Sequence, residues 1–188
     1  MPDITPAPDQ RHILSRLTLI LGGARSGKSA EAERRALMRA EELGVEPVYL
    51  ATAQAWDEEM AARIAQHQQQ RATAGWRTVE EPRALATVLA REAGVGRVVL
   101  VDCLTLWLSN LMMEEADIPA AVDGLLETLE AVPGDIILVT SEVGLGIVPE
   151  NAMARQFRDH AGLLHQRLGA QAETVVMMVA GLVMPVKG

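Results

Sequence analysis

Cysteine, aromatic residues and basic charge are all scarce in this chain of 188 residues. A single cysteine, Cys103, cannot form an internal disulfide, so nothing in the sequence requires an oxidising compartment. Aromatic residues make up 3% of the chain, too few for the stacking platforms on which single-strand binders hold bases. The 17 Lys and Arg residues against 25 Asp and Glu give a net charge of -8, which argues against binding to nucleic-acid phosphates. We therefore expect no nucleic-acid partner.

Long apolar runs are also missing. No stretch approaches the roughly 20 residues that a membrane-spanning helix requires, so we expect no transmembrane segment. Residues 1–12 contain acids and three prolines where a signal peptide would have a basic start and an apolar run. We expect a cytoplasmic protein with a disordered tail over residues 1–12 and one domain over residues 13–188. Hydrophobic residues make up 49% of the chain, enough to form the core of such a domain.

Short, almost continuously apolar segments alternate along the chain with longer segments of helical period. The apolar segments, which are strand candidates, are residues 17–21, 48–51, 98–101, 136–139 and 175–179. Strands of this kind are buried on both faces, as in a parallel sheet between layers of helices. The helix candidates are residues 28–43, 56–71, 83–92, 120–131 and 151–168. Together they predict an α/β fold, an open and mostly parallel sheet with helices on both faces.

A phosphate-binding loop directly follows the first strand candidate. Residues 22–29 read GGARSGKS, which fits the pattern G-x-x-x-x-G-K-[ST] between a strand and a helix. Glycines allow backbone N–H groups to surround phosphates, and the N-terminus of the helix adds positive potential. In this pattern Lys28 contacts the β- and γ-phosphate oxygens and the Ser29 hydroxyl binds Mg²⁺. The predicted nucleotide-binding residues of the loop are Gly22, Gly23, Ala24, Arg25, Ser26, Gly27, Lys28 and Ser29.

An acidic residue at the carboxyl end of another buried strand is expected to help hold the magnesium ion. Asp102 ends one strand candidate, and Glu142 lies just beyond another. Both strand ends face the same crevice in an open α/β sheet, so either carboxylate could serve. We predict Asp102 as the ligand, together with Ser29, because a buried strand positions it. We interpret the neighbouring Cys103 as a small buried apolar residue.

His67 lies within the helix candidate 56–71. Arg63 and Arg71 flank it at a spacing of four residues, one helical turn away on each side. Two neighbouring cations disfavour protonation of the imidazole and can gather phosphate oxygens around it. A neutral histidine in such surroundings can act as a nucleophile towards phosphorus. Taken alone, however, a histidine at the edge of an apolar stripe is more often a packing residue.

Seven segments of the chain together match the pattern of one enzyme family. They are GGARSGKS at 22–29, YLATA at 49–53, DEEMAARIAQH at 57–67, WRTVEEP at 76–82, VDCLTLWLSNLM at 101–112, EVGLGIVPEN at 142–151 and RQFRDHAG at 155–162. In this combination the chain resembles the bifunctional adenosylcobinamide kinase/adenosylcobinamide-phosphate guanylyltransferase family of cobalamin biosynthesis. The similarity covers nearly the whole chain from Leu19 on. Many families share a phosphate loop, whereas EVGLGIVPE and the RI-x-x-H helix are specific to this one.

The resemblance implies a P-loop nucleoside-triphosphatase-like fold and two activities. It also implies that the protein forms a homo-oligomer, namely a trimer. One activity phosphorylates adenosylcobinamide with ATP or GTP and Mg²⁺. The other transfers GMP from GTP to adenosylcobinamide phosphate, and the resemblance implies that His67 carries the GMP as a covalent intermediate. Outside the phosphate loop, the nucleotide contacts that it implies are Ala51, Thr52, Ala53, Gln68, Gln69, Gln70, Arg71, Glu80 and Asp102.

Two positions depart from the pattern of this family. Gln68 stands where the family often has a basic residue, which leaves Arg71 and Arg63 as the cations near His67. His165 stands in the place of an asparagine.

The residues alone leave alternatives open. One is an ordinary small-metabolite kinase that uses the same loop without a covalent intermediate, and another is a nucleotide-dependent switch or scaffold with negligible turnover. A set of apolar residues at helical spacing could form a wall for a corrinoid, but this pattern is more typical of core, and we interpret it as core. Its members are Trp107, Leu108, Leu111, Met112 and Met113.

Overall fold

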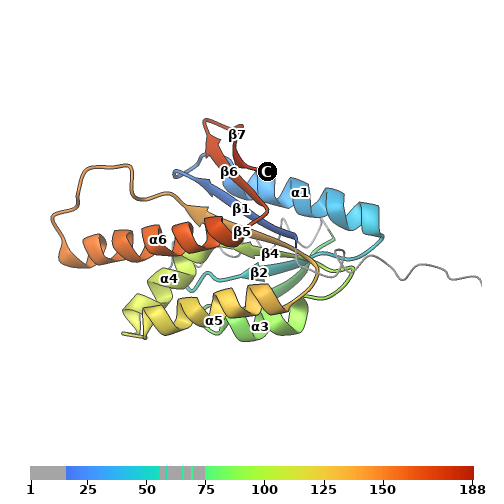
Figure 1. Ribbon diagram of the computed structural model, residues 1–188, viewed down its shortest axis with the longest axis horizontal. Helices are drawn as coiled ribbons and strands as arrows, with labels where there is room; N and C mark the ends of the chain where they lie inside the picture. The colour runs from blue at the N-terminus through green and yellow to red at the C-terminus, as the bar shows by residue number, and fades with distance from the viewer. Residues whose placement is uncertain (1–15, 56–57, 59–64, 66–68, 70–74) are drawn as a thin grey trace, which may run out of the picture.

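The structure, a computed structural model, describes residues 16–55, 58, 65, 69 and 75–188. Its sheet has seven strands in the order β3-β2-β4-β5-β1-β6-β7 (Figure 1). The strands are β1 (Arg16–Gly22), β2 (Val48–Ala51), β3 (Arg77–Glu80), β4 (Val98–Asp102), β5 (Asp135–Ser141), β6 (Thr174–Val179) and β7 (Leu182–Lys187). All neighbouring strands are parallel except β6 and β7, which are antiparallel. The predicted open, mostly parallel sheet is thus confirmed.

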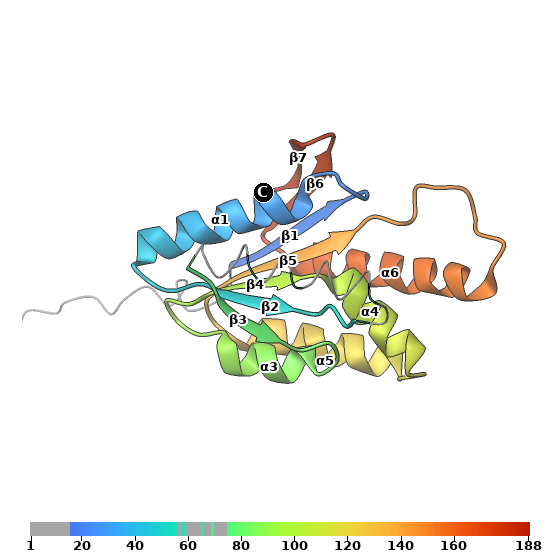
Figure 2. The same ribbon diagram turned by 180° about the vertical axis from the view of Figure 1, so that it is seen from behind.

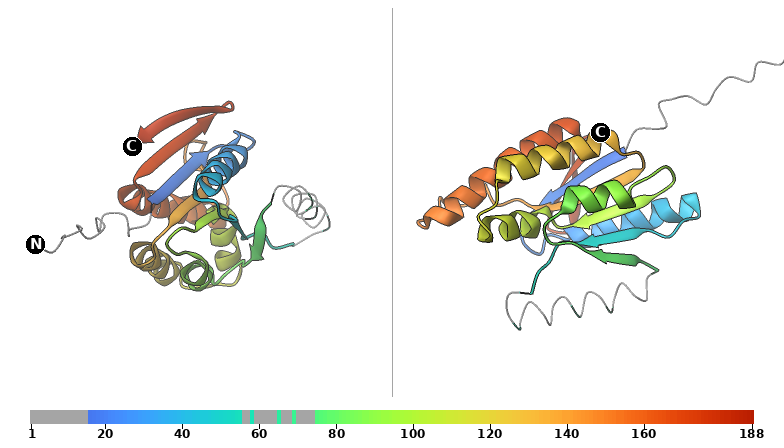
Figure 3. Two further views of the ribbon diagram at one scale, coloured as in Figure 1. Left: turned by 90° about the vertical axis from the view of Figure 1, so that its right-hand side faces the viewer. Right: turned by 90° about the horizontal axis from the view of Figure 1, so that it is seen from below.

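Helices cover both faces of this sheet, as predicted. The helices of the described residues are α1 (Lys28–Leu43), α3 (Leu85–Glu92), α4 (Leu104–Met113), α5 (Ile118–Ala131) and α6 (Ala152–Gln171). Helix α1 packs on one face and the other four on the opposite face (Figures 1 and 3). Each described helix is too short or too polar to cross a membrane.

Strand β4 shows how the apolar sequence produces these two layers. Val98 and Leu100 pack with the residues of α1, whereas Val99 and Val101 belong to the core on the other face. All four are fully buried, because side chains alternate between the faces of a strand and both faces are covered. The same alternation puts Asp102, two residues after Leu100, on the side of α1.

Two strands were not expected, and both lie at the edges of the sheet. Most of β3 is exposed, and all six residues of β7 are exposed, with Pro185 among them. Edge strands need neither a continuous apolar run nor a complete set of backbone donors, so their sequences lack the signature of a buried strand. The expected tail over residues 1–12 lies outside the described residues.

The described helices begin close to where they were expected. The Asp117 side chain accepts a hydrogen bond from the backbone N–H of Ala120 and thereby caps α5, which begins two residues before the predicted start. The Asn151 side chain caps α6 in the same way. Helix α4 was anticipated only as a set of apolar residues at helical spacing. Its Trp107, Leu108 and Leu111 are buried in the core, as interpreted, whereas Met113 is exposed.

Candidate functional site

Two glycines shape the loop that joins β1 to α1. A Cβ atom on Gly22 would lie 2.5 Å from Ser26 Oγ and 2.8 Å from the carbonyl oxygen of Met178, so no larger residue fits there. Gly27 precedes α1 with a φ of 96°, a left-handed conformation that glycine adopts readily. The loop therefore lies against the sheet and leads directly into the N-terminus of α1. The first N–H groups of a helix lack partners within the helix and point at whatever lies beyond its end.

Polar side chains of the loop add groups that suit a bound phosphate. Lys28 Nζ donates a hydrogen bond to the carbonyl oxygen of Gly23 at 2.8 Å, so the ammonium group lies over the loop. The hydroxyl of Ser26 is buried and has no hydrogen-bond partner among the residues that the structure describes. A buried hydroxyl without a partner is costly, and an oxygen atom of a bound phosphate could supply one. A cation, an unpaired hydroxyl and a helix N-terminus therefore converge on this loop.

The strand register brings the other predicted residues to the same edge of the sheet. Glu80 of β3 is aligned with Ala51 of β2, and Ala51 is aligned with Asp102 of β4. Gly22 of β1 is aligned with Ser141 of β5. The arrowheads of β1, β2 and β5 accordingly point the same way in Figure 2. The carboxyl ends of the parallel strands thus form one edge, as expected.

Glu80 lies far from the phosphate loop along this edge. Its strand β3 is four positions away from β1, which corresponds to about 19 Å at the usual spacing of strands. A contact between Glu80 and a nucleotide in the loop would therefore involve the base or the ribose and not the phosphates.

The carboxylate of Asp102 is held by a tyrosine that sequence reasoning did not assign to the site. The Tyr49 hydroxyl donates to Asp102 Oδ2 at 2.8 Å, and the Tyr49 ring is buried edge-on against Trp76 with ring centroids 5.4 Å apart. A carboxylate has two oxygens, so Asp102 can keep this bond and still offer Oδ1 to a ligand. The sequence indicated the face of the strand on which Tyr49 lies, because Tyr49 stands two residues before Ala51, but not the acceptor that its hydroxyl meets.

Hydrogen bonds of Thr52 and Asn110 fix the ends of β2 and β4. Thr52 is fully buried, and its Oγ1 donates to the carbonyl oxygen of Cys103 at 2.7 Å and accepts from the Cys103 N–H at 2.8 Å. Asn110 Nδ2 of α4, also unassigned from the sequence, donates to the carbonyl oxygens of Thr52 at 2.8 Å and Pro82 at 3.0 Å. Burial, and then the charge of Asp102, raises the pKa of the Cys103 thiol to about 11, so the thiol stays protonated near neutral pH.

Glu142, the alternative to Asp102 as a magnesium ligand, begins the loop that follows β5 and makes contacts there. Its backbone N–H donates to the carbonyl oxygen of Gly22 at 3.0 Å, which joins this loop to the phosphate loop. Its carboxylate accepts a hydrogen bond from the N–H of Gly144, and Oε2 lies 3.8 Å from Nδ1 of His165. His165 Nε2 lies 2.8 Å from the hydroxyl of Thr140. The histidine that departs from the family pattern thus connects α6 to the end of β5.

We predict that this histidine makes the stability of the fold depend on pH. Burial lowers the pKa of His165 below its usual value, although the charge of Glu142 opposes this shift. The unfolded chain therefore binds a proton more readily than the folded chain. Neutral His165 makes its full contribution to the free energy of unfolding above the unfolded pKa of about 6.5, and this contribution is lost as the pH falls below that value. Urea unfolding between about pH 7.5 and about pH 5 should show a steeper loss of unfolding free energy in the wild type than in His165→Asn. Equal pH dependence in the two proteins would exclude this role.

Part of the predicted site lies outside the described residues. These residues are His67, Gln68, Gln70 and Arg71, together with Arg63. Of the helix candidate 56–71, the structure describes Glu58, Ala65 and Gln69, all of them exposed. The described members of the site, from the phosphate loop to Ala51, Thr52, Ala53 and Asp102, lie at one edge of the sheet. The roles of His67 and Arg71 stay predictions.

A strand, a glycine-rich loop and a lysine-bearing helix N-terminus, with an aspartate at the end of a nearby strand, define a P-loop nucleotide-binding protein. The model of one protein family matches residues 18–186 of the chain, and its description is cobinamide kinase/cobinamide phosphate guanyltransferase. This chain belongs to that family, which confirms the family expected from the sequence motifs.

Two relatives match along almost their whole length. The chain is 54% identical to the bifunctional adenosylcobalamin biosynthesis protein CobP of Pseudomonas aeruginosa, over 90% of this chain and 96% of the relative. It is 41% identical to the bifunctional adenosylcobalamin biosynthesis protein CobU of Salmonella typhimurium, over 91% of this chain and 99% of the relative. Among solved structures, the flagellar accessory protein FlaH of Methanocaldococcus jannaschii aligns at a TM-score of 0.48 and 11% identity, over 92% of this chain and 78% of that one.

Proposed function

We propose that one nucleotide site, built on the phosphate loop and the ends of β2 and β4, serves both activities of the family, cobinamide kinase and cobinamide-phosphate guanylyltransferase. The observation that carries this proposal is the position of Lys28, whose ammonium group lies over the loop at the N-terminus of α1. Both reactions require a nucleoside triphosphate with its phosphates fixed in place, and phosphoryl chemistry depends chiefly on positioning and electrostatics. A single loop can therefore support both reactions.

In the kinase reaction, the hydroxyl of the aminopropanol arm of adenosylcobinamide attacks the γ-phosphorus of ATP or GTP. A new P–O bond forms as the hydroxyl gives up its proton to water, the bond from the γ-phosphorus to the β–γ bridging oxygen breaks, and the nucleoside diphosphate leaves. Lys28 and the N–H groups of the loop stabilise the negative charge that develops on the phosphate oxygens. No group of the protein becomes covalently attached in this step.

The residues present fit a magnesium ion that accompanies the nucleotide. Ser29 and Asp102 offer the oxygen ligands that Mg²⁺ prefers. In the part of the chain that the structure describes, no three His, Cys, Asp or Glu side chains cluster to form an all-protein metal site. This suits Mg²⁺, which usually keeps water molecules and binds through one or two carboxylates plus the phosphates of the substrate. When bound, the ion neutralises charge on the phosphate oxygens.

In the guanylyltransferase reaction, we assign the nucleophile to His67. Its imidazole attacks the α-phosphorus of GTP, the bond to the α–β bridging oxygen breaks, and pyrophosphate leaves. The phosphate group of adenosylcobinamide phosphate then attacks the same phosphorus, which releases His67 and gives adenosylcobinamide-GDP. Lys28 holds the phosphates of GTP in this reaction as it holds those of the donor in the first.

Labelling with GTP tests this function against the two alternatives. The protein is incubated with Mg²⁺ and GTP labelled at the α-phosphorus, denatured and separated by electrophoresis. A phosphoramidate on histidine is acid-labile and base-stable, so label with these properties on the protein supports the covalent guanylyltransferase. An ordinary metabolite kinase and a nucleotide-dependent switch would both leave the protein unlabelled. Phosphorylation of cobinamide by γ-labelled ATP then separates these two alternatives from each other.

We predict that Asp102→Asn weakens the magnesium dependence more than Glu142→Gln does. Asp102 lies on the side of α1 with one oxygen held by Tyr49, whereas the carboxylate of Glu142 is engaged by Gly144 and lies near His165. The Mg²⁺ concentration for half-maximal kinase activity should rise about tenfold or more in Asp102→Asn and less than about threefold in Glu142→Gln. A larger shift in the Glu142 variant would reverse the assignment.

We also propose that the protein acts as a homo-oligomer, for which the resemblance implies a trimer. Edge strand β7 supports this, because Leu182, Met184 and Val186 are exposed along it. An exposed apolar edge strand favours pairing with another chain unless something covers it. Sedimentation equilibrium of the full chain would show whether the mass corresponds to three copies.

A further inference from the structure

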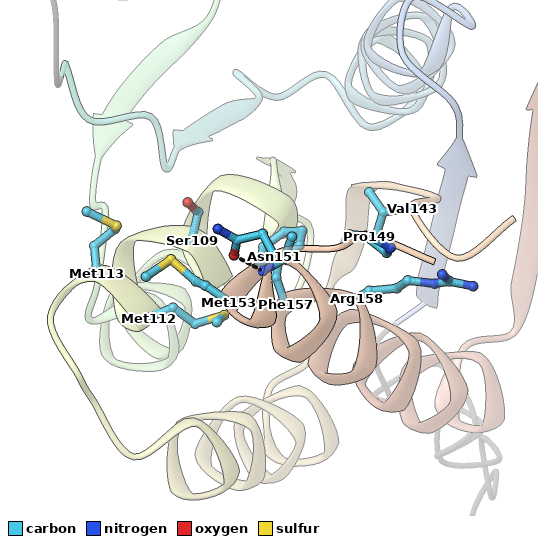
Figure 4. A pocket seen from close by; sticks show the side chains of 10 residues that line it. Ser109, Met112, Met113, Val143, Pro149, Asn151, Met153, Phe157 and Arg158 are labelled. Carbon is cyan, nitrogen blue, oxygen red and sulfur yellow. Dashed lines mark hydrogen bonds between the residues drawn. The ribbon is translucent and has the colours of Figure 1, made fainter. Parts of the chain in front are cut away.

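A pocket of about 420 Å³ lies between α4, α6 and the loop over residues 142–151. Figure 4 shows side chains of α4 and α6 facing each other across it. Its wall is mostly apolar, with Met112 and Met113 from α4, Met153 and Phe157 from α6, and Val143 from the loop. Methionine side chains are flexible and polarisable, so such a wall can adapt to the outline of a large apolar ligand. The volume falls within the range of small-molecule sites.

Polar groups lie around this apolar wall. Ser109 and Asn151 line the pocket, as does Arg158, which donates a hydrogen bond to the carbonyl oxygen of Gly144 at 2.7 Å. This bond holds the first part of the loop against α6. An apolar surface with a few hydrogen-bonding groups is the usual composition of a site for an organic ligand.

The pocket adjoins the edge of the sheet that carries the nucleotide site. Helix α4 begins two residues after Asp102, and the loop begins directly after β5. Glu142, which comes just before Val143 of the pocket wall, is hydrogen-bonded through its backbone to Gly22 of the phosphate loop. Two walls of the pocket therefore start at the strand ends that flank the nucleotide site.

We propose that this pocket binds one side of the corrin ring of the substrate, an inference that rests on the proposed function. A corrinoid has an apolar ring edge with methyl groups and several amide side chains, which match the apolar wall and the polar groups of the pocket. The ring is larger than the pocket, so part of it extends over the middle of the loop 142–151, where Leu145, Ile147 and Val148 are exposed. Because the loop over residues 142–151 begins beside the phosphate loop, the aminopropanol arm of a ring held there can extend towards that loop. The apolar residues of α4 thus divide between two roles, with Trp107 in the core and Met113 at the ligand.

Single charged substitutions on the two sides of the pocket test this proposal. Met113 and Met153 are each 55% exposed, so glutamate at either position can remain solvated in the free protein and the fold should be preserved. A corrin ring seated there would desolvate the new carboxylate. In equilibrium dialysis with cobinamide, followed by its visible absorption, Met113→Glu and Met153→Glu should each raise the Kd about tenfold or more. The matched control is Leu163→Glu, on the same helix α6 and 58% exposed but outside the pocket, which should leave the Kd unchanged.

Labelling by α-labelled GTP separates a failure of this inference from a failure of the proposed function. It requires no corrinoid, so both pocket variants should be labelled at the wild-type rate. If the wild type is active but Met113→Glu and Met153→Glu keep its Kd for cobinamide, the proposed function stands and the assignment of the corrinoid to this pocket is wrong. The same unchanged Kd together with a lower sedimenting mass would overturn it in favour of a contact between copies of the chain. A wild type that is neither labelled nor able to phosphorylate cobinamide would overturn the proposed function itself.

Discussion

Lys28→Ala is expected to abolish both activities while the fold remains intact. In the proposed mechanism each reaction places a triphosphate in the loop of residues 22–29, and the ammonium group of Lys28 lies over that loop. Loss of one preorganised charge at a transferring phosphoryl group costs about a thousandfold in rate. The variant should therefore lose at least this factor in cobinamide phosphorylation and in labelling by α-labelled GTP. Its urea unfolding curve should stay close to that of the wild type, because Lys28 contributes one hydrogen bond, to the loop itself.

The chain offers a matched control, because its two lysines are Lys28 and Lys187. Lys187 ends β7 and donates to the carbonyl oxygens of Gly169 and Ala170 at the end of α6. Lys187→Ala removes the same charge at a distance from the phosphate loop and should retain both activities. If Lys28→Ala kept near-normal turnover in either assay, the two reactions would not share the loop.

His67→Ala should separate the two activities. Transfer of the γ-phosphoryl group passes directly between bound substrates, whereas the guanylyl transfer proposed here requires a covalent histidine adduct. The variant should show no label from α-labelled GTP and no adenosylcobinamide-GDP, a loss of about a thousandfold or more, while its kinase activity stays within about tenfold of the wild type.

The other histidines of the described chain serve as controls for this experiment. His160 and His165 both lie on α6, and His160→Ala and His165→Asn should retain the label. Label that persists in His67→Ala and disappears in one of these variants would move the nucleophile to α6. Loss of the kinase activity together with the label would mean that His67 also helps to bind the nucleotide.

The buried part of the fold could be predicted from the sequence because burial leaves a local signal. Val98–Asp102 is a strand with apolar residues facing two helix layers, and its four valine and leucine residues follow each other without interruption. The edge strands β3 and β7 left no such signal, since one or both of their faces are exposed. The prediction of Asp102 as a site residue followed from that of β4, because ligands bind at the edge of the sheet where the buried strands end.

The contacts that hold the site could not be predicted, because they join residues that are distant in the sequence. Tyr49 reaches Asp102 across 53 positions, and Asn110 reaches the carbonyl oxygen of Thr52 across 58. A single sequence shows that each of these side chains can donate a hydrogen bond but not which acceptor it will meet. The pairing follows from the position of β2 beside β4, which only the folded sheet establishes.

The two helix layers have a consequence for how substrates enter and leave. Helix α1, which begins at the phosphate loop, lies on one face of the sheet, whereas α4 and α6, with the pocket between them, lie on the other. A nucleotide and a corrinoid bound in these places would meet at the edge of the sheet and depart on opposite sides of it. A nucleoside diphosphate leaving on the side of α1 would therefore not have to displace a corrinoid held between α4 and α6.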